Sequence, residues 1–265
     1  MIIKKGFNYL RENGLKDTFK IILFKYFKKY LNFFFRNFNK IKKINQSSKF
    51  KKIIIDTTYF NSDLCEISKN YKTDKSPYNL KHRHSYTGIY DFLFHKIKDY
   101  KLNIAEIGCY KNEGMKLFRD YFKNSNLYGY DIGQKYIDLA KKDDLKNTFY
   151  FLMDVNNDEN IQSGLSKCPE KFDIIIDDSS HIFNHQIKII KNSIPFLKKG
   201  SYLIIEDIFN DRHEHSEEKY FQSLTEIKQY FSEIYFIQSK HINNFSPLYN
   251  NDKLLVLERN EVIEL

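Results

Sequence analysis

Four acidic residues and a histidine follow two short apolar runs in the second half of this 265-residue chain. The first run ends on Asp177 and Asp178, with His181 three residues later, and the second run ends on Glu206 and Asp207. Short, uniformly apolar runs are typical of strands covered on both faces, and the periodic segment between them predicts a crossover helix. The two strands then run parallel, so their carboxyl ends meet at the edge where open α/β sheets bind ligands. We therefore expect the four carboxylates and the imidazole to converge.

Such a group of side chains suits the activation of a hydroxyl. A hard cation held by carboxylates can chelate two neighbouring oxygens and lower the pKa of one hydroxyl, and a histidine can accept its proton. His181 is the first candidate for this base. His213, in the polar segment 209–218 that we interpret as a lid or substrate loop, is the second. The alternative for a single acid is a helix cap or a turn, as for Asp178 or Asp207.

A glycine and an acid at predicted strand ends indicate a second site, for ligand binding, in the first half of the domain. Gly108 follows an apolar run, and Asp131 ends the next one, 23 residues later. Glycine lets the backbone approach a ligand, and the acid can bond both ribose hydroxyls. The next glycine after Gly108 is Gly114, so the G-x-G-x-x-G pattern that binds a pyrophosphate is missing. The pattern favours a ligand with adenosine but no pyrophosphate, whose adenine edge Asp154 could reach.

The elements that must position these residues alternate between strand and helix. Strands are expected at 102–107, 127–130, 149–153, 174–176, 202–205, 234–237 and 254–257. Helices are expected at 115–122, 136–142, 187–197 and 219–231. The last two strands are expected to form an antiparallel hairpin, whose long connection, 241–251, either contacts the substrate or only joins the strands. This order predicts an α/β fold with a doubly wound seven-stranded sheet.

The basic residues are concentrated at one end of the chain. Residues 1–52 contain 15 Lys+Arg and 2 Asp+Glu, a net charge of +13, whereas the remainder contains 28 Lys+Arg and 32 Asp+Glu, a net charge of −4. A surface that follows phosphates along a nucleic acid should be basic, so nucleic acid is not the expected partner of the acidic domain. We divide the chain into an N-terminal basic helical arm (1–50), a helical lead-in or lid (51–98) and the sheet domain (99–265).

The arm predicts an amphipathic helix over 19–41, with aromatic side chains on one side and lysines on the other. Its apolar runs are too short to span a membrane. A basic helix with large aromatic side chains instead suits an anionic membrane surface. The alternative is packing on the domain or on a second subunit, which would make a homodimer. Three cysteines without metal-ligand spacing favour a reducing compartment. We expect a cytoplasmic protein, peripheral on the inner membrane face.

The order of motifs resembles that of the class I S-adenosylmethionine-dependent methyltransferases, which have a Rossmann-like sheet. It is more closely similar to the metal-dependent sugar O-methyltransferases of macrolide biosynthesis and to the cephalosporin hydroxylase family. The motifs are E-I-G at 106–108, Y-G-Y-D at 128–131, M-D at 153–154, I-I-D-D-S-S-H at 175–181 and I-I-E-D at 204–207, preceded by D-K-S, H-S-Y-T and a tyrosine within 74–90. The resemblance covers about 73–259. This chain departs from the family pattern at three positions. Asn112 and Glu113 stand where the family has glycines, and Ser179 stands where the family's D-D-G-S-H motif has glycine.

The resemblance implies the following site. The cofactor contacts would be Tyr86, Glu106, Gly108, Asp131, Ile132, Asp154 and Asp177. The metal ligands would be Asp177, Asp178, Glu206 and Asp207, with Mg²⁺ as the expected ion. The implied reaction is O-methylation of a sugar hydroxyl by S-adenosylmethionine, on a nucleotide-linked or cell-surface polysaccharide precursor. The alternatives are a methyltransferase of another small molecule or of nucleic acid, and a non-catalytic membrane-associated binding protein.

Overall fold

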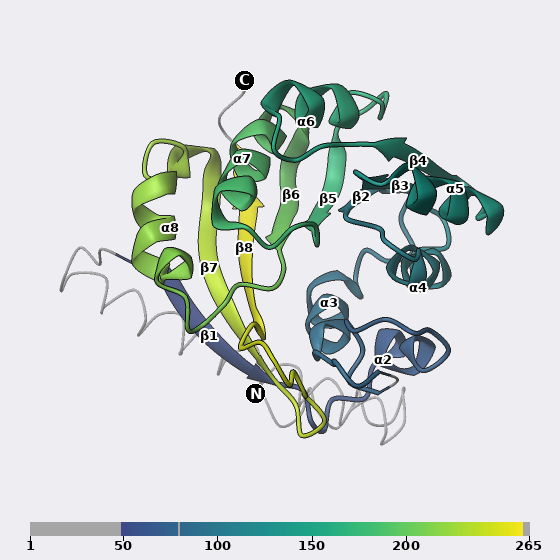
Figure 1. Cartoon of the computed structure of the whole chain (residues 1–265), viewed down its shortest axis with the longest axis horizontal. Helices are drawn as coiled ribbons and strands as arrows, with labels where there is room; N and C mark the ends of the chain where they lie inside the picture. The colour runs from purple at the N-terminus through teal and green to yellow at the C-terminus, as the bar shows by residue number, and fades with distance from the viewer. Residues whose placement is uncertain (1–48, 79, 262–265) are drawn as a thin grey trace, which may run out of the picture. The chain divides into compact units, whose positions relative to one another are not determined.

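The computed structural model describes residues 49–78 and 80–261 (Figure 1). The helix predicted over 19–41, and with it nearly all of the basic arm, lies outside the described residues. No helix within 49–78 or 80–261 is both long and apolar enough to cross a membrane.

Eight strands of the described chain form one sheet, in the order β1-β7-β8-β6-β5-β2-β3-β4. The strands are β1 (Lys51–Asp56), β2 (Asn103–Ile107), β3 (Asn126–Asp131), β4 (Thr148–Leu152), β5 (Phe172–Asp177), β6 (Leu197–Ile205), β7 (Phe231–Lys240) and β8 (Lys253–Arg259). Strand β8 runs antiparallel to both β6 and β7, and the other neighbouring pairs are parallel. The seven predicted strands and the antiparallel hairpin are therefore confirmed.

Strand β1 is the strand that the sequence analysis missed, because it lies in the lead-in that was predicted to be helical. It pairs in parallel with β7, from Lys51 opposite Tyr235 to Asp56 opposite Lys240, and forms the edge of the sheet. Most of its side chains are exposed. An edge strand with so little buried surface gives only a weak alternating pattern in the sequence.

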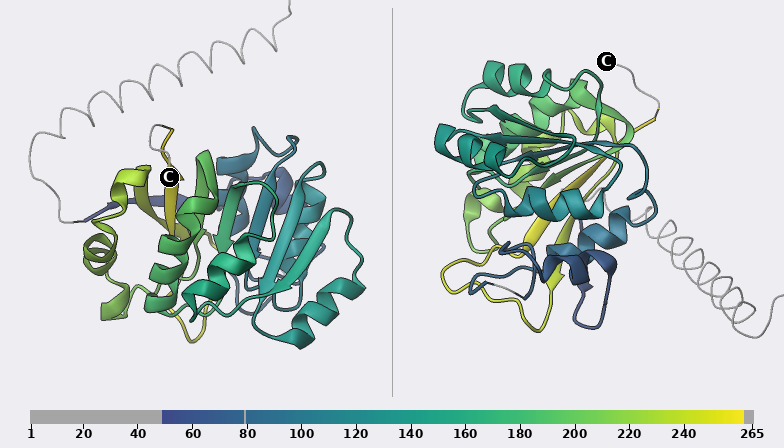
Figure 2. Two further views of the ribbon diagram at one scale, coloured as in Figure 1. Left: turned by 90° about the horizontal axis from the view of Figure 1, so that it is seen from above. Right: turned by 90° about the vertical axis from the view of Figure 1, so that its right-hand side faces the viewer.

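Helices cover both faces of the sheet (Figure 1, Figure 2). The helices are α2 (Asp63–Ser68), α3 (Tyr86–Phe94), α4 (Glu113–Tyr121), α5 (Gln134–Lys142), α6 (Asp158–Leu165), α7 (Phe183–Ser193) and α8 (Glu217–Leu224). Apolar residues of α6, α7 and α8 form the core on one face, and those of α2 to α5 form the core on the other. In β2, Ile104 faces the second core while Ala105 and Ile107 face the first on either side of Glu106, as the two-residue period of a strand requires.

Three helices differ from the prediction. Helix α7 was predicted over 187–197 but begins at Phe183 and ends at Ser193, and Leu197 already begins β6. Helix α6 was not predicted, because its sequence, DENIQSGL, carries few apolar residues; its N-cap is Asn157, whose side chain accepts a hydrogen bond from the Asn160 amide. Helix α8 was predicted to run to residue 231 but ends at Leu224, since Phe231 already begins β7.

The register of the central strands brings the acidic residues to one edge. Ile107 of β2 lies opposite Asp177 of β5, which in turn lies opposite Ile205 of β6. Backbone hydrogen bonds continue this alignment past the strand ends, from Asp178 N to Ile107 O at 2.8 Å and from Glu206 N to Asp177 O at 2.9 Å. The convergence expected from parallel strands is therefore confirmed.

Candidate active site

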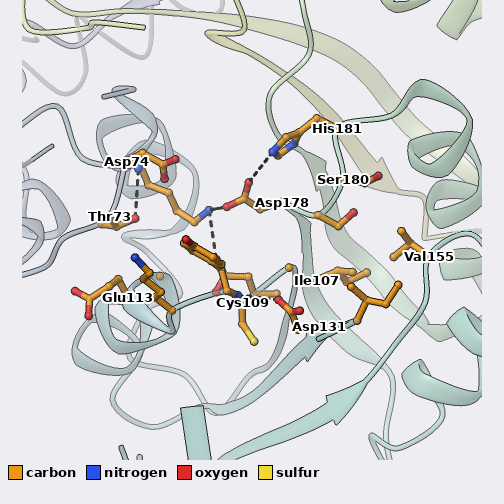
Figure 3. A pocket seen from close by; sticks show the side chains of 18 of the residues that line it. Thr73, Asp74, Ile107, Cys109, Glu113, Asp131, Val155, Asp178, Ser180 and His181 are labelled. Carbon is orange, nitrogen blue, oxygen red and sulfur yellow. Dashed lines mark hydrogen bonds and ion pairs between the residues drawn. The ribbon is translucent and has the colours of Figure 1, made fainter. Parts of the chain in front are cut away.

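A cavity of about 640 Å³ lies at the carboxyl ends of β2, β3, β4 and β5 (Figure 3). Its opposite wall is formed by the segment 72–75 that precedes α3. Five of the predicted cofactor contacts line it: Glu106, Gly108, Asp131, Ile132 and Asp154. The structure thus gathers in one cavity the residues that the sequence placed at separate strand ends.

Gly108 is required by the packing of two loops. Its φ is +97°, and a Cβ at this position would lie 2.2 Å from the Asp178 carbonyl oxygen. The chain after β5 therefore passes directly over the end of β2. Gly114 in α4 has a similar role, since a Cβ there would lie 2.5 Å from Glu106 Oε1. Because Gly108 and Gly114 carry no side chains, the D-D-S-S-H segment can pack directly on the end of β2, and α4 can pack directly on Glu106.

Asp131 is held in place by two backbone amides. Its Oδ2 accepts a hydrogen bond from Tyr110 N at 2.9 Å, and its Oδ1 accepts one from Gly133 N at 2.8 Å. Each carboxylate oxygen has a further lone pair, so both can still accept hydrogen bonds from a ligand. Ile132 beside it is 69 % exposed and offers an apolar surface to the same ligand.

The departures from the family pattern have structural roles here. Asn112 has a φ of +70°, a conformation that asparagine tolerates better than most residues other than glycine. Glu113 accepts a hydrogen bond from the Lys72 amide at 2.8 Å and so connects α4 to the opposite cavity wall. Ser179 Oγ donates a hydrogen bond to Asp177 Oδ1 at 2.6 Å. The three side chains therefore replace glycine without closing the cavity.

A fully buried lysine, Lys75, lies among the acids and was missed by the sequence analysis. Its Nζ is 2.9 Å from Glu206 Oε2 and 3.3 Å from Glu106 Oε1, and it also bonds Asp178 Oδ2. Burial alone would lower the pKa of Lys75, but the three carboxylates raise it well above its usual range. The lysine thus neutralises part of the charge and fixes the 72–75 wall to three strand ends.

Burial also changes the protonation of two predicted site residues. It raises the pKa of Glu106 to about 7, although Lys75 opposes the shift. It raises the pKa of Asp177 to about 6, against the hydrogen bonds from Ser179. Both carboxyl groups therefore bind protons in a pH range where an exposed acid would be ionised.

Asp207 is oriented by two hydrogen-bond donors on other segments, and the His84 imidazole lies beside it. Tyr86 Oη donates to its Oδ1 at 2.8 Å, Asn251 Nδ2 donates to its Oδ2 at 2.8 Å, and His84 Nε2 lies 3.4 Å from Oδ1. Its φ of +57° is unusual for a residue other than glycine. Tyr86, predicted to contact the cofactor, does not line the cavity; it is fully buried and holds Asp207 instead.

The predicted metal ligands fall into two groups. Asp178, His181 and Asp207 each place one ligand atom within 4.8 Å of the others. His181 Nε2 lies 3.8 Å from Asp207 Oδ2 and 4.0 Å from Asp178 Oδ1, and Figure 3 shows His181 and Asp178 directed toward each other. Asp177 and Glu206 lie outside this group, because Ser179 engages Asp177 while Lys75 and Tyr90 engage Glu206.

The two histidines of the 209–218 segment lie away from this chemistry. His213, the second candidate for the base, is exposed and does not line the cavity. His215 is buried against Phe183, Phe209 and Tyr220, and burial lowers its pKa to about 4. The connection between β7 and β8 contributes no residue to the cavity wall either. Of the histidines proposed as bases, the structure places only His181 in the cavity.

Comparison with known structures identifies the fold. The chain aligns with the MycE methyltransferase of the mycinamycin biosynthetic pathway in complex with Mg and SAH, with a TM-score of 0.58 and 23 % identity, over 77 % of this chain and 57 % of that one. A second MycE complex, with Mg, SAH and mycinamycin VI, gives 0.57 and 20 % identity over 76 % of this chain and 54 % of that one. The fold is that of a class I methyltransferase.

Curated methyltransferases are similar to part of the chain. Mycinamicin VI 2''-O-methyltransferase of Micromonospora griseorubida is 27 % identical over 157 residues, 56 % of this chain and 36 % of that protein. The tetracenomycin-C 3'-O-methyltransferase of Streptomyces olivaceus that acts on the 8-demethyl-8-(2-methoxy-alpha-L-rhamnosyl) compound is 26 % identical over 134 residues, 48 % of this chain and 33 % of that protein. The chain therefore spans about a third of the length of these relatives. No protein-family model matches it.

Proposed function

We propose that this methyltransferase-fold protein transfers a methyl group from S-adenosylmethionine to a sugar hydroxyl with the help of a divalent cation. One observation carries the proposal. The Gly108 and Asp131 strand ends lie in the same cavity as Asp178 and His181, which adjoin Asp207. The residues proposed to bind the nucleoside of the cofactor and those proposed to activate the acceptor hydroxyl are therefore close enough to serve one methyl-transfer reaction.

The cavity fits the charge of S-adenosylmethionine. Six carboxylic acids and three lysines line it, so it favours a cationic sulfonium over the pyrophosphate of a dinucleotide. Asp131 offers free lone pairs for a ribose. Glu106 Oε2 is buried and makes no hydrogen bond with any described residue, so it is available to a donor on a ligand.

The second cluster fits a hard divalent cation. Asp178 and Asp207 supply carboxylate oxygens, which Mg²⁺ and Mn²⁺ prefer, and His181 lies beside both. When bound, the cation would supply positive charge that lowers the pKa of a nearby sugar hydroxyl, and S-adenosylmethionine would supply an electrophilic methyl group. Tyr86 and Asn251 keep the Asp207 carboxylate directed toward this cluster.

His181 is the proposed base. Its Nε2 takes the proton as the acceptor hydroxyl oxygen forms the new O–CH₃ bond and the S–CH₃ bond breaks, so the products are a methyl ether and S-adenosylhomocysteine. The φ of His181 is +54°, and a strained backbone of this kind is common where a side chain must be aimed at a reaction.

For the acceptor, we propose a sugar of a nucleotide-linked or cell-surface polysaccharide precursor. Support for a sugar comes from the relatives, whose names describe methylation of mycinamicin VI and of a rhamnosyl compound. Support for a precursor assembled at a membrane comes from the basic arm, whose charge suits an anionic surface.

The test is a methylation assay with the full-length protein. Sugar nucleotides and glycan precursors are incubated with methyl-labelled S-adenosylmethionine, with Mg²⁺ or with excess chelator, and the products are analysed by mass spectrometry. We expect one carbohydrate to gain a methyl group, only when the metal is present. Methylation of RNA or protein with every carbohydrate unchanged would refute the sugar assignment, and full turnover in chelator would refute the metal.

A further inference from the structure

A second cluster of potential metal ligands lies beside the candidate active site. Asp74, His82 and His84 each place one ligand atom within 4.8 Å of the others. None of these residues belongs to the Asp178, His181 and Asp207 group. We propose that Asp74, His82 and His84 form a separate binding site for a divalent transition-metal ion of the Zn²⁺ class.

Backbone hydrogen bonds bring the three residues together. His84 N donates to Asp74 O at 2.7 Å, which closes the segment 74–84. Arg83 and Phe245 form an antiparallel bridge, with N–H···O distances of 2.9 and 3.0 Å, so the same segment is fixed to the connection between β7 and β8. The ligand positions are therefore set by the fold and do not depend on a metal to assemble them.

His84 has the environment of a metal-bound histidine. Its side chain is 1 % exposed, and its Nδ1 contacts the Asp252 carboxylate at 2.5 Å. Histidine ligands usually have their second ring nitrogen held by a carboxylate in this way. The other nitrogen, Nε2, makes no hydrogen bond with any residue of 49–78 or 80–261, and the Asp207 Oδ1 lies 3.4 Å away. A buried nitrogen without a hydrogen bond is costly, and coordination to an ion would satisfy it.

His82 is held in a similar way. Its Nε2 contacts Ser246 Oγ at 3.0 Å, which leaves Nδ1 for an ion. The His82 and His84 rings lie edge to face, with centroids 4.6 Å apart. Ser246 and Asp252 both belong to the segment between β7 and the start of β8, so this segment supplies the outer partners of both imidazoles.

The donor set selects the class of ion. Two imidazoles and one carboxylate suit Zn²⁺, Co²⁺ or Ni²⁺, whereas Mg²⁺ prefers oxygen ligands alone. The acids Asp74, Asp207 and Asp252 surround the two imidazoles, so a dication would also balance the local charge. Asp74 lies in the cavity wall (Figure 3), and an ion there would hold this wall residue against the two imidazoles of the same segment.

Zinc binding by a variant without the first cluster tests the proposal. The full-length Asp178→Asn, His181→Ala double variant is titrated with Zn²⁺, and bound metal is measured by calorimetry and by elemental analysis after desalting. We expect one Zn²⁺ per chain, with an X-ray absorption spectrum that shows imidazole ligands. Adding His82→Ala should weaken this binding at least tenfold, since even the loss of an outer partner costs about 10–100-fold. Ser246→Ala, which removes such a partner, should give a smaller loss.

The matched control is His95→Ala, which removes an exposed histidine at the end of α3 and should leave zinc binding unchanged. Circular dichroism confirms that each variant is folded. If the double variant binds no Zn²⁺, then His84 is held only as an ion-paired imidazolium between two acids, and the proposal is wrong. Binding through thiolates, or equal binding with and without His82, would also overturn it. Zinc binding is measured without turnover, so a failure of the zinc site is distinguishable from a failure of the proposed methyl transfer.

Discussion

His181 carries the proton transfer in the proposed reaction, because its Nε2 lies within 4.0 Å of two acids that adjoin the cavity. We expect His181→Ala to lower kcat by about 10²-fold or more, as for the loss of a general base, and to leave the affinity for S-adenosylhomocysteine unchanged. Steady-state kinetics and calorimetry measure the two quantities. Unchanged turnover would remove His181 from the mechanism, and a parallel loss of Mg²⁺ affinity would show that it is a ligand and not the base.

Asp131 tests the cofactor assignment. Asp131→Ala should remove the acceptor for a ribose, together with the carboxylate that accepts hydrogen bonds from the Tyr110 and Gly133 amides. A hydrogen bond to a charged group is worth about 1.5–3 kcal/mol, so the affinity for S-adenosylhomocysteine should fall about 10–100-fold in calorimetry. Asp138→Ala, on the exposed surface of α5, is the control. Equal affinities in the two variants would count against the adenosine site.

His215 should make the protein sensitive to acid. Its pKa is about 4 in the folded state, below the usual 6.5, so between these values the unfolded chain binds a proton that the folded protein rejects. The contribution of His215 to the free energy of unfolding should therefore fall as the pH drops from 6.5 to 4, while the raised pKa values of Glu106 and Asp177 act in the opposite direction. His215→Leu should change the slope of unfolding free energy against pH by up to one proton relative to the parent, in the direction of greater stability at low pH, in urea unfolding at a series of pH values. His95→Leu should keep the slope of the parent; the same slope in His215→Leu would mean that this imidazole is not the group that titrates.

At the scale of elements, the contact between the ends of β2 and β5 depends on Gly108. Gly108→Ala meets two penalties, a φ of +97° and a Cβ 2.2 Å from a backbone oxygen. Gly200→Ala meets only the first, since its φ is +75° and the nearest atom to a Cβ is 3.7 Å away. We expect Gly200→Ala to cost about 1–2 kcal/mol of unfolding free energy. Gly108→Ala should cost about 1–3 kcal/mol more. Equal losses in denaturant unfolding would show that the two loops are not tightly packed.

The central strands could be predicted, and the contacts between distant loops could not. Asp177 and Glu206 follow uniformly apolar runs, and the crossover connection forces those strand ends to the same edge. Lys75 gives no such signal, because a single lysine in a polar loop is normally solvated and only the folded chain brings three acids around it. Tyr86 was assigned from resemblance alone, which located the motif but not the direction of its side chain. Helix α6 and strand β1 were missed because neither buries enough apolar surface to produce a clear period.

At the scale of the whole molecule, the basic arm predicts attachment to a membrane surface. Removal of residues 1–48 keeps Phe50, which packs against Phe221 and Phe236 of the domain. We expect this truncation to abolish sedimentation with anionic vesicles at low salt and to leave the affinity for S-adenosylhomocysteine intact, because electrostatic attraction to lipid requires the clustered lysines. Neutral vesicles are the control. A full-length protein that ignores anionic vesicles would make the arm a packing or dimer element instead.

The lysine at the centre of the acids has a consequence for the order in which the chain folds. Lys75 meets Glu206 across 131 positions of sequence, and Tyr86 meets Asp207 across 121. Closing such long loops is entropically slow compared with pairing β2, β3 and β4, which are neighbours in the chain. We expect the sheet around β2 to form early and the Lys75 contacts to form last. A refolding chain should therefore recover its secondary structure before it regains a pocket able to retain a ligand, and amides of the 72–86 segment should be among the later ones protected from hydrogen exchange.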